Sequence, residues 1–262
     1  MLICAVGDLL LDVIVRLDGP IAADTDTYGQ TSVGAGGQAA NVAAWAAALG
    51  GRGRFLGKRA RDAAGRVLAD ELAARGVELA GPEVERGTGT VVSIAGADGS
   101  RSMLSDRGVA IEFAPEEVDP AWLEGCDWLH VPGYSLVRQP LSAAATRAAA
   151  VAPRVSVDAS STAAIDEVGP ELFRELVRDL GPEVVFANEA EAELLGALEG
   201  TTLVVHGSTG CRVGAESFAA VAADVVDTTG AGDAFAAGYL LGGPQLALEA
   251  AARCVGRMGA MP

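Results

Sequence analysis

Short apolar runs rich in β-branched residues alternate along the chain with longer segments rich in alanine and leucine. This alternation is typical of strands and helices in an α/β protein with a mostly parallel sheet. The short runs predict strands at 2–6, 54–56, 128–131, 155–158, 184–187 and 202–206. The longer segments predict helices at 37–49, 62–75, 141–151, 170–180, 189–195, 231–241 and 245–255.

Two segments interrupt this alternation. Residues 12–33 alternate apolar and polar positions without room for a helix, and residues 88–104 are typical of a hairpin that turns at Ala97 to Gly99. Insertions made only of strands predict a small β lid standing off the main body, with edge strands of the main sheet as the alternative. We therefore predict a single domain over 1–262, with a lid formed by about 12–33 and 88–107.

Composition narrows the class of protein. Of the 262 residues, 50% are hydrophobic, which is enough for a sizeable core. The formal net charge of −16 disfavours nonspecific binding to nucleic acid or to an anionic membrane. The four cysteines form no C-x-x-C pair, and no apolar run reaches the ~20 residues of a membrane helix. We expect a cytoplasmic protein with reduced thiols and small-molecule partners.

The stretch from Asp227 to Asp233, DTTGAGD, leads straight into a predicted helix. Helix N-termini expose unpaired N–H groups with a partial positive charge, and small residues let an anion approach them. A phosphate or a developing oxyanion can therefore lie against the amides of Gly230, Ala231 and Gly232. Asp233 would also stabilise the helix start in a purely structural role, and this is the alternative interpretation.

A second glycine-rich element, Gly36 and Gly37 followed by Asn41, also opens a predicted helix. Asn41 lies one turn after Gly37, so its amide can point back toward the loop. Backbone groups and an amide together suit a ligand with many hydroxyls. Asp12 adds a carboxylate that can accept hydrogen bonds from a sugar. The alternatives are helix packing for the glycines and an exposed loop charge for Asp12.

Together these elements resemble the ribokinase family, also called the phosphofructokinase-B (pfkB) family of carbohydrate and nucleoside kinases, over nearly the whole chain. The family signature D-T-x-G-A-G-D is intact at Asp227–Asp233, and G-G-x-x-x-N is present at Gly36–Asn41. A third signature, N-x-x-E, is present at Asn188–Glu191. Gly7–Asp12 is similar to the family's G-D-x-x-x-D opening, and the turn with Gly207 and Gly210 is similar to its glycine turn beside the nucleotide.

The resemblance implies a ribokinase-like three-layer α/β/α sandwich that transfers the γ-phosphoryl group of ATP to a hydroxyl of a small carbohydrate. The acceptor would be a sugar, a sugar acid or a sugar phosphate. Asp233 would be the base, with the amides of Gly230, Ala231 and Gly232 as the anion hole. Asn188 and Glu191 would organise Mg²⁺ and phosphate through hard oxygen ligands. Positioning and charge stabilisation are what phosphoryl transfer chiefly requires.

The resemblance also assigns the remaining candidates. Asp12, Gly36, Gly37 and Asn41 would bind the sugar, and Gly207 and Gly210 would lie beside the nucleotide. Asp227 and Thr229 match positions where some family members hold a monovalent cation, and the use of potassium stays open. The lid would exclude water and pair two subunits into a homodimer.

Arg107 follows the second lid segment and is explained least by the resemblance. An arginine at the mouth of the pocket can pair with a carboxylate or a phosphate on the acceptor. The alternative is a surface salt bridge.

Three other functions compete with a sugar kinase. A nucleoside kinase of the same family is the nearest, because the motifs describe the transfer and not the acceptor. A catalytically silent sugar- or nucleotide-binding protein is the second, although Asp233 and the anion-hole glycines are all present. A Rossmann oxidoreductase would place G-x-G-x-x-G directly after the first strand, where this chain has GDLLLD.

Overall fold

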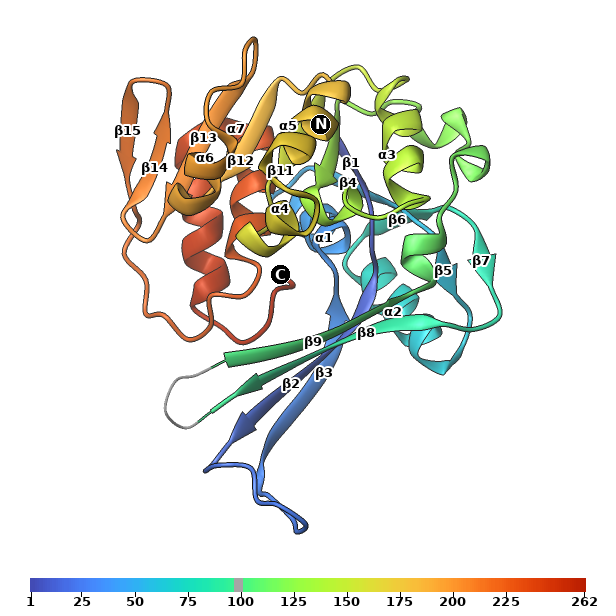
Figure 1. Cartoon of the computed structure of the whole chain (residues 1–262), viewed down its shortest axis with the longest axis vertical. Coiled ribbons are helices and arrows are strands. Elements are labelled where there is room, and N and C mark those ends of the chain that lie inside the picture. The colour runs from blue at the N-terminus through green and yellow to red at the C-terminus, as the bar shows by residue number, and fades with distance from the viewer. Residues whose placement is uncertain (97–100) are drawn as a thin grey trace.

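The computed structural model describes residues 1–96 and 101–262. In this part of the chain the main sheet has nine strands, in the order β15-β14-β13-β12-β11-β10-β1-β4-β6 (Figure 1). Its parallel strands are β1 (Leu2–Val6), β4 (Arg52–Leu56), β6 (Val77–Ala80), β10 (Trp128–Pro132), β11 (Val155–Asp158), β12 (Val184–Ala187) and β13 (Thr202–Gly207). Two antiparallel strands, β14 (Gly210–Val213) and β15 (Glu216–Ala219), extend one edge.

Helices cover both faces of this sheet. One apolar core lies between the sheet and α1 (Gln38–Ala48), α2 (Ala63–Ala74) and α7 (Ala231–Val255). The other lies beneath α3 (Leu141–Ala149), α4 (Thr162–Val168), α5 (Pro170–Asp179) and α6 (Glu189–Leu195). Helix α7 is kinked at Gly243, where φ is 78°, just before Pro244, and this kink separates the two helices predicted there. The result is the predicted three-layer α/β/α sandwich.

A separate four-stranded sheet stands off this body (Figure 1). It contains β2 (Leu10–Leu17), β3 (Gly29–Gly36), β8 (Thr88–Ala95) and β9 (Arg101–Gly108), in the order β3-β2-β8-β9. These strands do not extend the main sheet, which was the alternative. The turn predicted at 97–99 lies outside the described residues.

Several short elements have no counterpart in the sequence prediction. They include β6, α4, β14 and β15, the paired strands β5 (Arg59–Ala60) and β7 (Glu83–Val84), and 3₁₀ turns at Val109–Glu112, Pro115–Glu117, Pro120–Leu123 and Gly133–Ser135. Each spans between two and seven residues, which is too short for hydrophobic periodicity to distinguish from a loop. Pairing with neighbouring strands, and not local pattern, determines the five strands among them.

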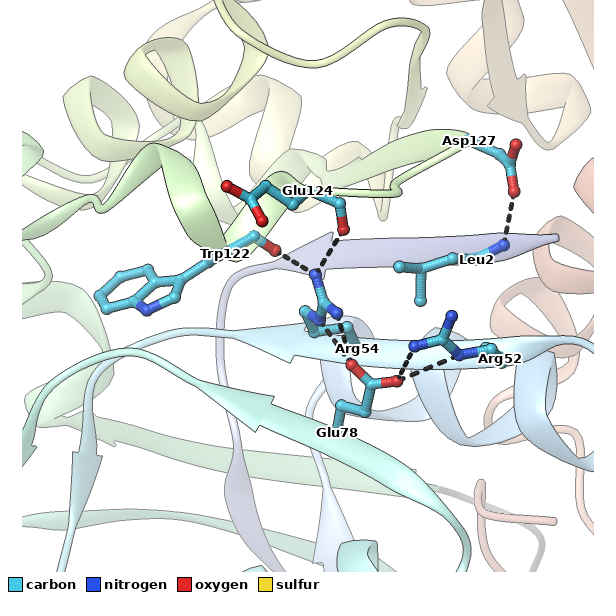
Figure 2. A network of polar contacts seen from close by, with 7 residues as sticks. All are labelled: Leu2, Arg52, Arg54, Glu78, Trp122, Glu124 and Asp127. Atoms are coloured by element: carbon cyan, nitrogen blue, oxygen red, sulfur yellow. Dashed lines mark hydrogen bonds and ion pairs between the residues drawn. The ribbon is translucent and has the colours of Figure 1, made fainter.

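Charged side chains tie together the amino-terminal ends of β4 and β6, the last two strands at one side of the main sheet (Figure 2). Arg52 and Arg54 on β4 both bind the carboxylate of Glu78 on β6, with N···O distances of 2.5 Å. Arg54 also donates to the carbonyl oxygens of Trp122 and Glu124, at 2.6 and 3.1 Å. The side-chain charges of Arg52, Arg54 and Glu78 are paired with one another, so this cluster holds the two strands together.

All four cysteines are buried and free, which agrees with the predicted reduced thiols. Among the helices of the described residues, none has the length and apolar character needed to cross a membrane.

Candidate active site

Several polar residues, some predicted as site residues and some not, gather at the opposite edge of the sheet, at the carboxyl ends of the parallel strands. Asp8 follows β1, Asp158 is the last residue of β11, and Asn188 directly follows β12. Gly207 ends β13, and α7 begins nearby, since Gly232 lies close to the imidazole of His206. Ligands of open α/β sheets bind at this edge, because loops and helix N-termini converge there.

Helix α7 begins without a side-chain cap. Its N-cap is Gly230, in the left-handed conformation with φ 78°, and no side chain accepts from the first-turn amides. A Cβ at Gly230 would lie 2.5 Å from the Cβ of Ala260, so only glycine fits at this position. The helix start thus has no side-chain cap, and its dipole is positive at this end; the N–H of Ala231 donates to the carbonyl oxygen of Thr228 at 3.3 Å. The anion hole predicted here stays a prediction.

Asp233 lies in the first turn of α7, and 5% of its surface is exposed. The Nδ2 of Asn41 donates to its Oδ2 at 2.7 Å, which joins the two predicted helix starts directly. Burial raises the pKa of Asp233 well above the usual value, and the charges of Asp158, Asp8 and Asp12 raise it further against the lowering effect of the Asn41 hydrogen bond. A buried carboxylate with raised proton affinity is the type of group that serves as a general base.

Gly36 and Gly37, which precede α1, lie so close to Asp12 and Asp8 that neither position has space for a side chain. A Cβ at Gly36 would lie 2.1 Å from the carboxylate carbon of Asp12. A Cβ at Gly37, where φ is 98°, would lie 2.4 Å from the carbonyl oxygen of Asp8. These glycines therefore bring the loop after β1 close to the start of α1, and so place two carboxylates near Asn41.

Arg107, on β9, forms an ion pair with Asp8, whose side chain is only 5% exposed. Its guanidinium also lies 4.2 Å from the centre of the Tyr134 ring. The hydroxyl of Tyr134 is 2.7 Å from the Oγ of Ser161. The pair thus joins the lid sheet to the carboxyl end of β1 and is largely buried, unlike the surface salt bridge considered as an alternative.

Asn188 and Glu191 form a reciprocal capping box at the start of α6. The backbone N–H of Asn188 donates to Glu191 Oε2 at 2.9 Å, and the N–H of Glu191 donates to Asn188 Oδ1 at 3.0 Å. This reciprocal capping is a structural role at the start of the helix. Burial nevertheless raises the pKa of Glu191.

Asp158 is a site residue that the sequence analysis missed. Its pKa is raised to about 7, first by burial and then by the negative charge of Glu191. Two buried carboxylates that repel each other at the same sheet edge fit a divalent cation, which would relieve that repulsion. The only sequence signal for Asp158 is a carboxylate that ends a buried strand.

An apolar cavity of about 500 Å³ opens beside the start of α7. The imidazole of His206 stacks on Phe235 in its wall, with 4.8 Å between ring centres, and burial lowers the pKa of His206 to about 4. Gly207 lines the cavity, whereas Gly210 does not and instead packs against the carbonyl of Phe218 on β15. The remaining lining residues are Ser208, Ala220, Val221, Ala222, Ala223, Val225, Thr228, Ala231, Leu248, Ala251, Ala252 and Val255.

Asp227 binds its own loop. Its Oδ1 accepts from the N–H and the hydroxyl of Thr229, at 3.0 and 2.7 Å. Its Oδ2 accepts from the N–H of Gly259 at 3.1 Å. We call residues 227–232 the anion-hole loop; Asp227 ties this loop to the segment that follows α7.

Solved structures of kinases share this fold. The crystal structure of adenosine kinase from Sinorhizobium meliloti is 27% identical, with a TM-score of 0.85 over 99% of this chain and 95% of that one. A putative ribokinase II from E. coli, in complex with ATP and Mg²⁺, is 21% identical with a TM-score of 0.82 over 99% of this chain and 94% of that one. The fold is therefore that of a ribokinase-like kinase.

Sequence comparison gives the family. The profile described as pfkB family carbohydrate kinase matches residues 1–261. The ATP-dependent ribose-1-phosphate kinase of Halopiger xanaduensis is 31% identical over 98% of this chain and 93% of its own length. The probable chloroplastic fructokinase-6 of Arabidopsis thaliana is 28% identical over 89% of this chain and 68% of its own length.

This chain belongs to the pfkB family of carbohydrate kinases. The predicted family, fold class and activity, that of an ATP-dependent phosphotransferase acting on a carbohydrate hydroxyl, are thereby confirmed.

Proposed function

We propose that Asp233 is the base that removes the proton from the acceptor hydroxyl. The observation that carries this proposal is the buried hydrogen bond of 2.7 Å between Asn41 Nδ2 and Asp233 Oδ2. The oxygen of the same side-chain amide, Asn41 Oδ1, is buried and has no hydrogen-bond partner among the described residues. A hydroxyl that donates to Asn41 Oδ1 would lie beside Asp233, which is the position that the transfer requires.

The anion-hole loop would stabilise the group in transfer. At the start of α7, the backbone N–H groups of Gly230 and Gly232 would bind the phosphoryl oxygens, joined by that of Ala231, which donates to the carbonyl oxygen of Thr228 at 3.3 Å in this structure. The negative charge of the phosphoryl group next to Asp233 would also disfavour the ionised carboxylate, and so would favour its taking a proton. Proton removal and phosphoryl transfer would therefore be coupled at one helix start.

ATP would lie in the apolar cavity, with its base among the alanine and valine side chains and its phosphates toward Gly207 and the anion-hole loop. His206 is neutral at physiological pH because burial lowers its pKa to about 4, so it contributes packing and not charge. Asp158 and Glu191 would hold Mg²⁺ through its water shell. When bound, Mg²⁺ would neutralise charge on the phosphates.

The acceptor would be a small sugar, free or phosphorylated, held by Asp12, Asn41 and the backbone around Gly36 and Gly37. The relatives named above support this range, since one acts on ribose 1-phosphate and another is a probable fructokinase. The adenosine kinase structure, at 27% identity, makes a nucleoside the second candidate. The charge of Arg107 is already neutralised by Asp8. Arg107 would therefore act on the acceptor indirectly, by positioning the carboxylate of Asp8.

The test is ADP release measured with MgATP and a panel of fructose, ribose, ribose 1-phosphate and adenosine. We expect turnover with one or more of the sugars and its loss in Asp233→Asn. Asp224→Asn, the same change at an exposed aspartate just before the loop, is the matched control. Undiminished turnover in Asp233→Asn would contradict the proposed base. Absence of turnover with every acceptor would favour the silent binding protein.

The lid sheet would close over the acceptor and pair with the lid of a second subunit. It exposes large apolar side chains, Val33 at 70%, Met103 at 55% and Leu104 at 59%. Sedimentation of the wild type and of Met103→Glu tests this. A dimer that the substitution dissociates is expected, and a monomeric wild type would contradict it.

A further inference from the structure

The carbonyl oxygens around the anion-hole loop are already occupied by donors from elsewhere in the chain. The thiol of Cys254, near the end of α7, donates to the carbonyl oxygen of Thr229 at 3.3 Å. The indole Nε1 of Trp45, on α1, donates to the carbonyl oxygen of Ala260 at 2.8 Å. Trp45 is fully buried, and Ala260 is the residue that packs against Gly230.

The same is true of the carboxylate in the loop. Asp227 accepts three hydrogen bonds from Thr229 and Gly259, through both of its oxygens. The carbonyl of Val255 accepts from the N–H groups of Val226 and Asp227, at 2.8 and 3.2 Å. The loop and the segment after α7 are therefore joined by donor–acceptor pairs internal to the protein.

This arrangement fits a monovalent cation poorly. Such a cation is held by several oxygen atoms with free lone pairs that converge on one point. Here a thiol and an indole N–H point at two of the candidate oxygens, and a donor beside each oxygen repels a cation. The guanidinium of Arg257 lies 5.0 Å from the centre of the Trp45 ring, and it adds a fixed positive charge to the same region.

We propose that protein donors, chiefly the Trp45 indole and the Cys254 thiol, hold the anion-hole loop where a monovalent cation would otherwise sit. Trp45 and Cys254 are positioning residues, because they act on the loop and touch no reacting atom. The inference rests on the proposed function in its kinetic part only, since it concerns the loop proposed to stabilise the transferred group.

The first test compares salts. Turnover with the best acceptor is measured in potassium chloride and in tetramethylammonium chloride at equal ionic strength, with Mg²⁺ constant. We expect kcat to differ by less than about twofold between the two salts. Stimulation by potassium of about tenfold or more would overturn the inference.

The second test does not depend on turnover. The melting temperature of the wild type is measured in the same two salts without nucleotide. A cation that binds the folded protein raises the melting temperature in a saturable way. We expect equal melting temperatures, and a saturable rise specific to potassium would overturn the inference. If no acceptor supports turnover, the proposed function fails while this measurement still decides the inference.

Substitutions test the donors themselves. Cys254→Ala removes the donor to Thr229, whereas Cys254→Ser retains one. We expect kcat to fall several-fold in Cys254→Ala, with KM for ATP changing less, and to recover in Cys254→Ser. Cys126→Ala, which removes a buried thiol far from the loop, should leave kcat unchanged. Equal kcat in Cys254→Ala and the wild type would overturn the role of the thiol. Trp45→Phe, which keeps an aromatic ring but loses the N–H, tests the indole in the same way.

Discussion

The two edges of the central sheet treat carboxylates in opposite ways. At the amino-terminal edge, Glu78 is bound by Arg52 and Arg54, and these hydrogen bonds lower its pKa (Figure 2). At the same edge, Arg154 pairs with Glu183 at 2.8 Å. Acidic groups at this edge are stabilised as anions, which is what a structural ion pair does.

At the carboxyl-terminal edge, Asp158, Glu191 and Asp233 are buried, and burial raises the pKa of each. Arg107 pairs with Asp8 at this edge, but no ion pair to Asp158, Glu191 or Asp233 is found in the described part of the chain. When these three carboxyl groups ionise, their negative charges lie close together, and a metal ion or a proton can neutralise them. Residues in one sheet are thus distinguished as structural or functional by whether their charge is balanced within the protein.

The largest predicted effect tests the unbalanced edge. Asp233→Asn removes the base but keeps the size of the side chain, and we expect kcat to fall about 10²–10⁴-fold. Because the raised pKa means that the folded protein disfavours the charged carboxylate, stability at pH 8 should be equal or higher in the variant. Steady-state kinetics and urea unfolding measure the two effects. Loss of both activity and stability would show that Asp233 is structural.

The next prediction tests the balanced edge. Arg54→Gln leaves the carbonyl oxygens of Trp122 and Glu124 without their donor, and we expect the free energy of unfolding to fall by about 2–3 kcal/mol. The kcat should not change. Arg52→Gln is the matched control, because the side chain of Arg52 is 63% exposed and such pairs contribute less than about 1 kcal/mol. Equal losses of stability in the two variants would contradict this difference between them.

Many strands and helices of the main α/β body could be predicted from the sequence. Strands 155–158 and 184–187 and helix 189–195 were predicted with the bounds that the structure has, because their apolar runs end at clear polar or glycine boundaries. The start of α7 at Ala231 was also predicted from the small residues that precede it. The short antiparallel strands were not, because their partners are chosen by tertiary pairing.

The unbalanced edge was harder to predict. Asp158 has no local motif, and its proximity to Glu191 depends on the order of the strands. The sequence identified Gly36 as a ligand contact, but the space that its missing Cβ leaves is filled by Asp12. Asn188 and Glu191 matched the N-x-x-E site motif, and the structure shows that they also form a capping box. A sequence motif thus identifies the region of a candidate site, but it does not show whether a given residue contacts the ligand or contacts its neighbours in the protein.

Gly232→Ala tests the space at the helix start. A Cβ at this position would lie 3.7 Å from His206 Cε1, an ordinary contact, so the fold tolerates it. Alanine in place of glycine should stabilise the helix by up to about 1 kcal/mol. The methyl group would narrow the approach to the anion hole, and we expect kcat/KM for ATP to fall about tenfold. Gly256→Ala, which also meets only ordinary contacts at the other end of α7, is the control.

The smallest predicted effect concerns pH. Asp158→Asn removes a charge that raises the pKa of Asp233, so the acid limb of the kcat/KM profile should move to lower pH by less than about one unit. Asp158 itself has its pKa raised from 3.8 to about 7, so its stabilising contribution is complete below its unfolded pKa and is lost as the pH rises through about 7. As the pH rises from 3.8 to about 7, the free energy of unfolding of the wild type in metal-free buffer should therefore fall more steeply than that of the variant. Parallel stability curves would show that Asp158 is not held in its protonated form, and would remove one of the three unbalanced charges on which the contrast between the two edges rests.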